Sequence, residues 1–132
     1  MAVSVSISTK ELERQAKLAF EGKTYKLFLA VKGALTVDST RVNWEAAEIS
    51  GNGYAAATGT IPAGSYSSGN GRYEMPAISG TFTASGAGFT YDTLCLAIDG
   101  SAYLHSILVE SPTVTLAAGQ SKSYTLTLAQ DD

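Results

Sequence analysis

The spacing of apolar residues near the N-terminus predicts a helix over residues 9–21. Ser8 opens the sequence STKE, a Ser-x-x-Glu capping box whose hydroxyl and carboxylate can satisfy two free amides at a helix start. Gly22 follows as a residue that ends helices well. Between them the apolar residues recur at i, i+4, i+7 and i+8, which places them on one helix face: Leu12, Ala16, Ala19 and Phe20.

After Gly22 the spacing of apolar residues shortens to every second position, which is the pattern of a β-strand with one buried face. The residues expected on the buried face are Tyr25, Leu27, Leu29 and Val31, and those on the other face are Lys26, Phe28, Ala30 and Lys32. The same alternation occurs at the start of the chain, in Val3, Val5 and Ile7. It predicts a strand-like arm over residues 1–8.

A second, shorter helix is predicted through STRVNWEAAE. Asp38 or Ser39 is suited to cap its start, and Gly51 to end it. Trp44 and Ala47 then lie on one side of the helix. We interpret Trp44, the only tryptophan, as a core anchor rather than a ligand platform.

Beyond residue 50 the sequence favours turns and short strands. Nine of the thirteen glycines lie in residues 51–88, where helix propensity is therefore poor. The pair Asn70 and Gly71 suits a tight hairpin turn, and SGTFTAS alternates like a short strand.

The last third predicts two hairpins. GFTYDTLCLAI and AYLHSILV are strand-like runs separated by residues 99–101, Asp-Gly-Ser, and AAGQSK separates TVTL from SYTLTLA. Strands separated by frequent turns, without alternating helices, are typical of antiparallel architectures. We therefore expect a mainly β fold, an antiparallel β-sandwich or small barrel with an N-terminal helix and a short second helix, forming a single domain over residues 1–132.

Charge is scarce and unevenly distributed. Only 16% of the residues are charged, and residues 1–49 hold seven of the nine Lys and Arg. A nucleic-acid partner is disfavoured because the rest of the chain cannot form the cluster of cations that displaces counterions from phosphates. No apolar run approaches the roughly 20 residues needed to cross a bilayer, so no membrane partner is expected.

The single cysteine, Cys95, lies in the apolar run TLCLAI, where a buried thiol is expected rather than a nucleophile or metal ligand. One cysteine allows no intramolecular disulfide. The start of the chain, MAVSVSISTK, lacks the basic and apolar regions of a secretion signal.

Residues 51–56, GNGYAA, satisfy the loose dinucleotide-binding pattern GxGxxA. That pattern requires a preceding strand and a following helix. Here it follows a predicted helix and runs into TGTIPAG, where Pro62 and the glycines discourage another. Glu74, at the distance of the ribose acid, sits beside a predicted turn. We interpret the segment as structural and expect no cofactor.

No catalytic or metal-binding constellation is evident in the sequence. The only histidine, His105, is predicted in mid-strand on a polar face, and neither neighbour is a carboxylate. Asp92, Asp99 and Glu110 are spread over separate predicted strands and turns, without the spacing of a metal site. A pair of carboxylates for glycoside cleavage stays open, because acids distant in sequence can meet in a fold. We nevertheless expect a protein that is not an enzyme.

The segment WEAAEISGNGY resembles a motif of small virion structural proteins of tailed bacteriophages, cyanophages included. In that motif a short acidic helix leads into Glu-(Val or Ile)-(Ser or Thr)-Gly-x-Gly-Tyr and then into β structure. The matching residues here are Glu48, Ile49, Ser50, Gly51, Gly53 and Tyr54. Weaker similarity extends to TLCLAID, YLHSILVESPTVTL and AAGQSKSYTLTL near the end of the chain.

The resemblance implies a virion location, after assembly in the host cytoplasm, as a head decoration (cement), tail or fibre-associated protein. The expected partners of a decoration protein are the major capsid protein and copies of the chain itself, with a trimer among the options. A surface with few charges to desolvate suits such contacts. The expected partner-binding residues are the apolar residues of the arm and three tyrosines: Val3, Val5, Ile7, Tyr54, Tyr66 and Tyr73.

The tyrosines also support an alternative from another class of function. Tyr on rigid strands and loops is a good contact residue for sugars as well as for proteins. A β-sandwich carbohydrate-binding module that uses Tyr66 and Tyr73 is therefore the alternative expectation.

Overall fold

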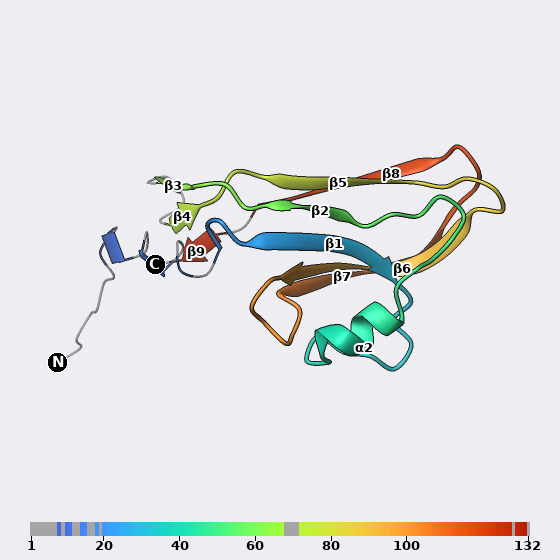
Figure 1. The fold of residues 1–132 in the computed structure, drawn as a ribbon, viewed down its shortest axis with the longest axis horizontal. Coiled ribbons are helices and arrows are strands. Elements are labelled where there is room, and N and C mark those ends of the chain that lie inside the picture. The colour runs from blue at the N-terminus through green and yellow to red at the C-terminus, as the bar shows by residue number, and fades with distance from the viewer. Residues whose placement is uncertain are drawn as a thin grey trace. The chain divides into compact units, whose positions relative to one another are not determined.

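The computed structural model describes residues 8, 10, 11, 14, 15, 18, 20–67, 72–127 and 129–131. Its contacts divide the chain into two compact units. One contains residues 24–59 and 79–124, and the other takes its described residues from 1–23, 60–78 and 125–132. The elements (Figure 1) are β1 (Thr24–Ala30), α2 (Arg41–Ala46), β2 (Ala57–Thr60), β3 (Ser65–Ser67), β4 (Arg72–Glu74), β5 (Ile78–Thr83), β6 (Phe89–Ile98), β7 (Ser106–Leu116), β8 (Ser121–Leu126) and β9 (Ala129–Asp131).

Four strands form the largest sheet, in the order β2-β1-β6-β7. β1 pairs antiparallel with β6, from Tyr25 opposite Ile98 to Ala30 opposite Thr93, and β6 pairs antiparallel with β7. The β6–β7 register shifts between Tyr91 and Thr93. The prediction of a mainly β fold with antiparallel pairing is confirmed.

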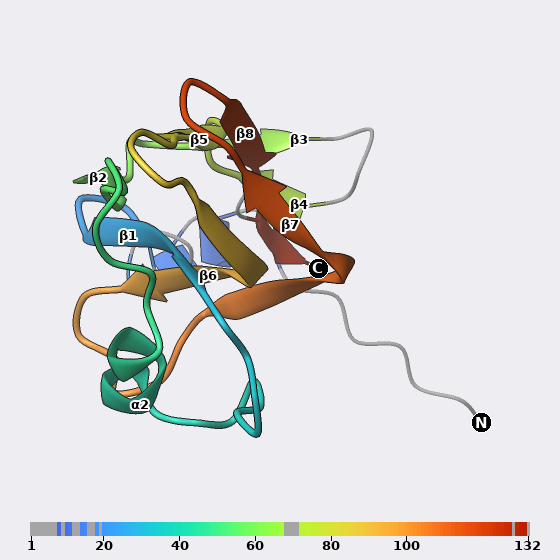
Figure 2. The ribbon, with the colours of Figure 1, turned by 90° about the vertical axis from the view of Figure 1, so that its right-hand side faces the viewer.

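The prediction that β1 has one buried face is wrong, because residues 27–30 are all 0% exposed. Figure 2 shows the reason: α2 lies on one side of β1 and β6, and β5 and β8 lie on the other. Phe28 belongs to a buried cluster with Trp44 of α2. On the other side, β5 lies close to β1 and β2, because a Cβ on Gly80 of β5 would lie 3.4 Å from Leu27 Cδ1 and only 2.8 Å from the Ala57 Cβ of β2. Val31, expected on the buried face, is 50% exposed.

The short helix α2 begins and ends differently from its prediction. Its N-cap is Thr40, whose hydroxyl accepts from Asn43 N at 3.3 Å, so Asp38 and Ser39 do not cap it. The helix ends at Ala46, ahead of Gly51. Trp44 is 0% exposed and its Nε1 donates to the carbonyl of Thr36 at 2.9 Å, which confirms its prediction as a core anchor.

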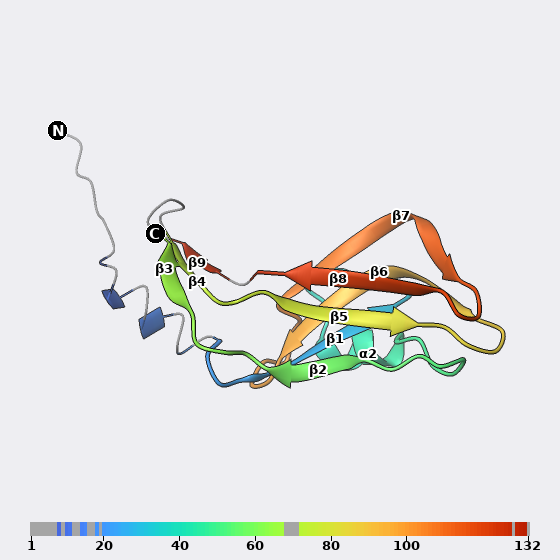
Figure 3. The same cartoon turned by 90° about the horizontal axis from the view of Figure 1, so that it is seen from above.

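For the last third of the chain, the approximate positions of the strands were predicted correctly, but one of the two predicted pairings was not. β6 and β7 do pair, but residues 99–105 connect them, so His105 lies in a bend before β7 rather than in mid-strand. The predicted pairing of the last two runs is wrong. β8 pairs with β5 in a separate two-stranded sheet (Figure 3). The hydroxyls of Thr81 and Ser123 lie 2.8 Å apart across this pair. The turn at AAGQ reverses the chain, but periodicity does not say which strand lies beside β8.

The remaining strands form a three-stranded sheet, β3-β4-β9, in which Tyr66 lies opposite Tyr73 in the backbone register. The predicted turn at Asn70 and Gly71 lies outside the described residues.

The predicted N-terminal helix lies largely outside the described residues and stays a prediction. Ser8 Oγ accepts from Glu11 N at 3.1 Å, as the capping box requires. Among the described residues of this range, Lys10, Glu11, Arg14, Gln15 and Leu18 have helical backbone, whereas Phe20 and Glu21 lie in a turn. Among the described residues, no helix is long and apolar enough to span a membrane.

Candidate interaction surface

The GNG turn at residues 51–53 is a packed junction between two loops. Gly51, Asn52 and Gly53 all have positive φ, at 77°, 52° and 82°. The carbonyl of Asn52 accepts from Ser85 N at 2.8 Å, and a Cβ on Gly53 would lie 2.5 Å from Ser85 Oγ. The positive φ favours glycine at position 53, and any larger residue would also force the Ser85 side chain to move. These contacts support a structural interpretation of GNGYAA.

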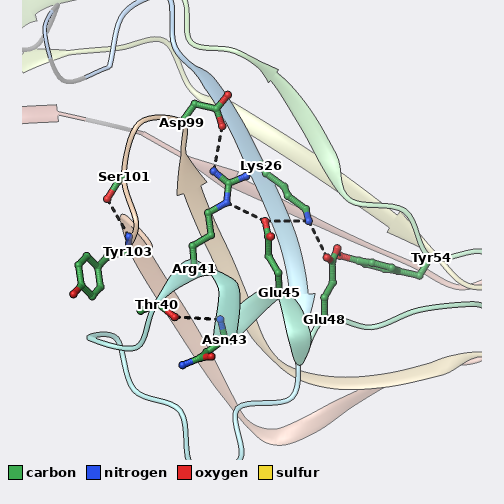
Figure 4. A network of polar contacts seen from close by, with 10 residues as sticks. All are labelled: Lys26, Thr40, Arg41, Asn43, Glu45, Glu48, Tyr54, Asp99, Ser101 and Tyr103. Atoms are coloured by element: carbon green, nitrogen blue, oxygen red, sulfur yellow. Dashed lines mark hydrogen bonds and ion pairs between the residues drawn. The ribbon is translucent and has the colours of Figure 1, made fainter.

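Tyr54, the next residue, is bonded within the fold (Figure 4). Its hydroxyl donates to Glu48 Oε2 at 2.7 Å. It also accepts from Leu29 N at 2.9 Å. Its ring stacks on Phe82 with centroids 6.0 Å apart and meets the Phe89 ring edge-on at 5.7 Å. Burial, reinforced by the hydrogen bond to Glu48, raises the pKa of Tyr54, so this hydroxyl stays protonated. Its contacts make Tyr54 an internal anchor.

The segment before Tyr54 closes the outer edge of β1. Leu29 O accepts from Ile49 N at 2.9 Å, and Val31 N donates to Ala47 O at 3.3 Å. Between these two bonds, Ala30 and Glu48 form an antiparallel bridge. Residues 47–49 and the Tyr54 hydroxyl thus satisfy backbone groups of β1 that would otherwise be left at a buried sheet edge. Sequence reasoning missed this role, because the Tyr54 and Leu29 partners are 25 positions apart.

A chain of ion pairs ties α2 to β1 and to the loop after β6 (Figure 4). Lys26 Nζ lies 2.8 Å from Glu48 Oε1 and 3.4 Å from Glu45 Oε1. Arg41 Nε lies 2.9 Å from Glu45 Oε1, and its NH1 lies 3.1 Å from Asp99 Oδ1. Burial alone would raise the pKa of Glu45, but its bonds to Arg41 and Lys26 outweigh this and lower it. Glu45 is therefore a fixed negative charge of the scaffold, unlike an acid that exchanges protons near neutrality.

Beside α2 lies an open depression of ≈ 510 Å³. It is lined by Val37, Asp38, Tyr103, Leu104 and His105. A hydrogen bond from Arg41 N to Ala102 O, at 2.8 Å, attaches the loop that carries Tyr103 to the start of α2. Tyr103 is 53% exposed, so its ring is presented to solvent. Of these five residues, only His105 was weighed as a candidate from the sequence.

β7 continues directly from this depression and is an edge strand of the four-stranded sheet, at the end opposite β2. Its first half reads SILVE, with Leu108 47% exposed and Val109 46% exposed. In the part of the chain that the structure describes, no strand pairs with the side of β7 that faces away from β6. Ile107 instead packs against the buried cluster beneath α2. This edge combines free backbone positions with apolar side chains at the surface.

Of the predicted partner-binding residues, Val3, Val5 and Ile7 lie outside the described residues. Tyr66 and Tyr73 are neighbours in the β3–β4 register, and only their backbone is described. The structure thus brings these two tyrosines together, while Tyr54 belongs to the other compact unit. The partner-binding assignment itself stays a prediction.

Two other residues that the sequence analysis considered for chemistry, Cys95 and Asp92, have structural surroundings: Cys95 is buried and Asp92 is hydrogen-bonded. Cys95 is 0% exposed, as predicted, and burial raises its pKa to about 12, with smaller contributions from nearby carboxylates. Asp92 Oδ1 accepts from Lys32 N and from Thr93 Oγ1, each at 2.9 Å. Within the described ranges, no group of three or more His, Cys, Asp or Glu side chains is placed to hold a metal ion.

Comparison with known proteins yields no relative: no protein-family model, curated protein or solved structure matches the chain.

Proposed function

We propose that this chain is a non-enzymatic structural protein of a bacteriophage virion, and specifically a capsid decoration protein that self-associates on the head and stabilises the major capsid lattice. The virion setting rests on the resemblance of residues 48–54 to the phage motif. The fold adds support, because Glu48, Gly53 and Tyr54 of that motif are all used to build the scaffold.

The observation that carries the assembly role is the β7 edge. Leu108 and Val109 are each nearly half exposed on a strand at the end of a sheet. Exposed apolar edges pair readily with other chains, and natural proteins usually protect them with charge, proline or a cover. Residues 106–109 of this edge carry no charge, which suits a protein whose working state is an assembly.

The proposal includes a β-sandwich arrangement for the unit that contains residues 24–59 and 79–124. Tyr91 of β6 and Tyr124 of β8 join their hydroxyls at 2.7 Å, and Tyr124 donates to Glu110 of β7 at 2.9 Å. The Tyr124 ring also meets Phe82 of β5, with centroids 6.3 Å apart. Side chains of the two sheets thus interdigitate, as in packed antiparallel layers.

Capsid binding tests the proposal directly. Purified protein is added to capsids of the phage that encodes it, prepared without the protein, and bound copies and capsid melting temperature are measured. We expect saturable binding and a raised melting temperature. Protein that neither binds nor stabilises these capsids contradicts the decoration role.

Copy number separates head from tail. Quantitative mass spectrometry of intact virions is expected to give hundreds of copies for a head protein, since decoration follows lattice symmetry. A count of roughly six to a few dozen fits the symmetry of a tail and would move the assignment to a tail or fibre-associated protein.

The depression beside α2 favours a second candidate function, carbohydrate binding. An exposed tyrosine ring next to a carboxylate and an imidazole is a suitable platform for a sugar, and Tyr103, Asp38 and His105 line this site together. A glycan array probed with the wild type and Tyr103→Ala tests it. Binding that this variant abolishes supports the site. Binding that only Tyr66→Ala or Tyr73→Ala abolishes places a sugar site on β3 and β4 instead, and an array without signal rejects both.

A further inference from the structure

We propose that two copies of this chain associate through β7, with residues 106–110 paired antiparallel to the same residues of the second copy and Leu108 on the two-fold axis. This inference rests on the proposed self-association and adds the surface and the register. It joins the four-stranded sheets of the two copies into one continuous sheet.

The backbone of β7 sets the chemistry of the partner. A strand at the end of a sheet presents a row of amide and carbonyl groups along one side, and another strand satisfies them best. Residues 106–109 of β7 have none of the features that usually block such pairing. Residues 106–109 carry no charge and no proline, whereas Pro112 and the register irregularity come later in the strand.

The outer side of β1 shows how a strand edge is closed in this molecule, partly by β2 and partly by residues 47–49 and 54. β2 has only four residues, ATGT, and alternates between partly buried and exposed positions. Beyond it, residues 47–49 and the Tyr54 hydroxyl cover the edge of β1. β7, at 11 residues, is the longest strand in the described part of the chain. It has no comparable cover there.

The sequence of β7 is complementary to itself in one register. With the two-fold axis at Leu108, Leu108 of one copy lies opposite Leu108 of the other. Ile107 of each copy then lies opposite Val109 of the other, and Ser106 opposite Glu110. Each carboxylate then lies opposite a hydroxyl that can donate to it. The two Glu110 residues lie roughly 14 Å apart along the strands, from a rise of about 3.4 Å per residue, so their repulsion is largely screened.

Neighbouring registers are less favourable. An axis at Val109 brings Pro112 opposite Ser106, where proline has no amide to donate. An axis at Glu110 places two carboxylates face to face, which is destabilising. An axis at Ile107 moves Glu110 opposite Leu104, outside the strand. Leu108 on the axis keeps the paired segment within β7 and away from Pro112.

The occupant is a second copy because each copy supplies the strand, the apolar pair and the hydroxyl that the other needs. Pairing over five residues is a small interface, below the area of stable complexes, so the dimer is expected to dissociate on dilution. On a lattice that already holds many copies, effective concentration strengthens the same contact. Weak pairing in solution therefore suits a protein that assembles on a surface.

Sedimentation equilibrium of the full chain over a range of concentrations gives the dimer dissociation constant. Leu108→Lys places two ammonium groups opposite each other at the axis, and we expect the dissociation constant to rise by at least about tenfold. Val42→Lys is the matched control, because Val42 is an apolar residue of α2 with 75% of its surface exposed. It should dimerise like the wild type. Unchanged far-ultraviolet circular dichroism and melting temperature show that both variants are folded.

The register is tested by cross-linking. Leu108→Cys should give a covalent dimer under mild oxidation or with a short bismaleimide, since the two-fold axis places the new thiols of the two copies next to each other. Val42→Cys should give no covalent dimer. Cys95 is buried and present in both variants, so any cross-linking through it is the same in both. A covalent dimer of Leu108→Cys together with weakened association of Leu108→Lys supports the inference.

The inference is overturned if the wild type is monomeric at every concentration, or if it dimerises while Leu108→Lys has no effect and Leu108→Cys gives no covalent dimer. Dimerisation that is lost when residues 2–7 are deleted, without cross-linking at position 108, assigns the contact to the N-terminal arm and also overturns it. Capsid binding judges the proposed function separately. A monomer that decorates capsids leaves that function standing, and a β7 dimer that ignores capsids rejects it.

Discussion

Two strand sides of the four-stranded sheet are treated in opposite ways: the outer side of β1 at Leu29 and Val31, called the β1 edge, and the outer side of β7, called the β7 edge. At the β1 edge, the Tyr54 hydroxyl and residues 47–49 bond backbone groups of a strand whose residues 27–30 are fully buried. At the β7 edge, Leu108 and Val109 are nearly half exposed, and no strand covers them within the described residues. An edge beside the core must be closed internally because a buried amide without a partner is costly. At an edge in contact with solvent, water satisfies the backbone groups until a partner strand binds.

The β1 edge depends first on α2, which carries the chain into the closing segment. Trp44→Ala removes a side chain that is 0% exposed and the bond from its Nε1 to Thr36 O. We expect the free energy of unfolding to fall by about 3–5 kcal/mol, as for other large-to-small core substitutions. Urea denaturation measures this, with Val42→Ala on the exposed face of the same helix as control. A loss below about 1 kcal/mol would mean that α2 does not hold this edge.

The Tyr54 hydroxyl is the next largest contribution. Tyr54→Phe keeps the ring contacts with Phe82 and Phe89 but leaves the buried Leu29 amide without its acceptor. The expected loss is about 1–3 kcal/mol. Faster hydrogen exchange of the Leu29 amide would locate the loss at this edge. Tyr103→Phe removes an exposed hydroxyl and serves as control, and an equal loss in both variants would refute the edge-closing role.

The ion pairs of α2 add a smaller contribution that depends on pH. The pKa of Glu45 lies below its ordinary value of 4.5 in the fold, because its bonds to Arg41 and Lys26 outweigh burial. Its contribution is therefore present above the unfolded-state pKa and is lost as the pH falls from about 4.5 through the folded pKa. We expect less than about 1 kcal/mol, since these side chains are partly exposed. Glu45→Gln should flatten the stability curve in this acid range compared with the wild type, and an unchanged curve would contradict the assignment.

The β7 edge should contribute least to the stability of the monomer. Leu108→Thr keeps a residue with high β propensity while removing apolar surface that is 47% exposed. We expect its unfolding free energy at low protein concentration to stay within about 0.5 kcal/mol of the wild type. At high concentration the same substitution should weaken dimerisation. A large loss of monomer stability would mean that this edge belongs to the core.

Several features of the fold were evident in the sequence because they depend on neighbouring residues. The period of two predicted β1, and the alternation in SGTFTAS predicted β5, whose residues alternate between buried and exposed. Trp44 and Cys95 were expected in the core and are 0% exposed. A hydrophobic pattern reports local geometry and the preference for burial, and both act over a few residues.

The misses have one physical cause, which is contact between segments distant along the chain. β1 is buried on both faces because α2 covers one face and β5 and β8 approach the other. The partner of β8 is β5, although the turn at AAGQ suggested a hairpin. Thr40, which forms an antiparallel bridge with Tyr103, caps α2 in place of two neighbouring residues that were equally plausible from sequence. No local pattern distinguishes these alternatives.

By itself, the sequence determined that this protein is a β-rich chain with little charge, a tryptophan anchor and a glycine-dependent turn before Tyr54, because composition, periodicity and turn chemistry are local properties. The tertiary structure decided that the Tyr54 hydroxyl helps close the outer side of β1 and that no strand pairs with the outer side of β7 within the described chain. Strand order depends on the lowest free energy of the whole fold, so the edge available to a partner emerges only when all strands have been placed.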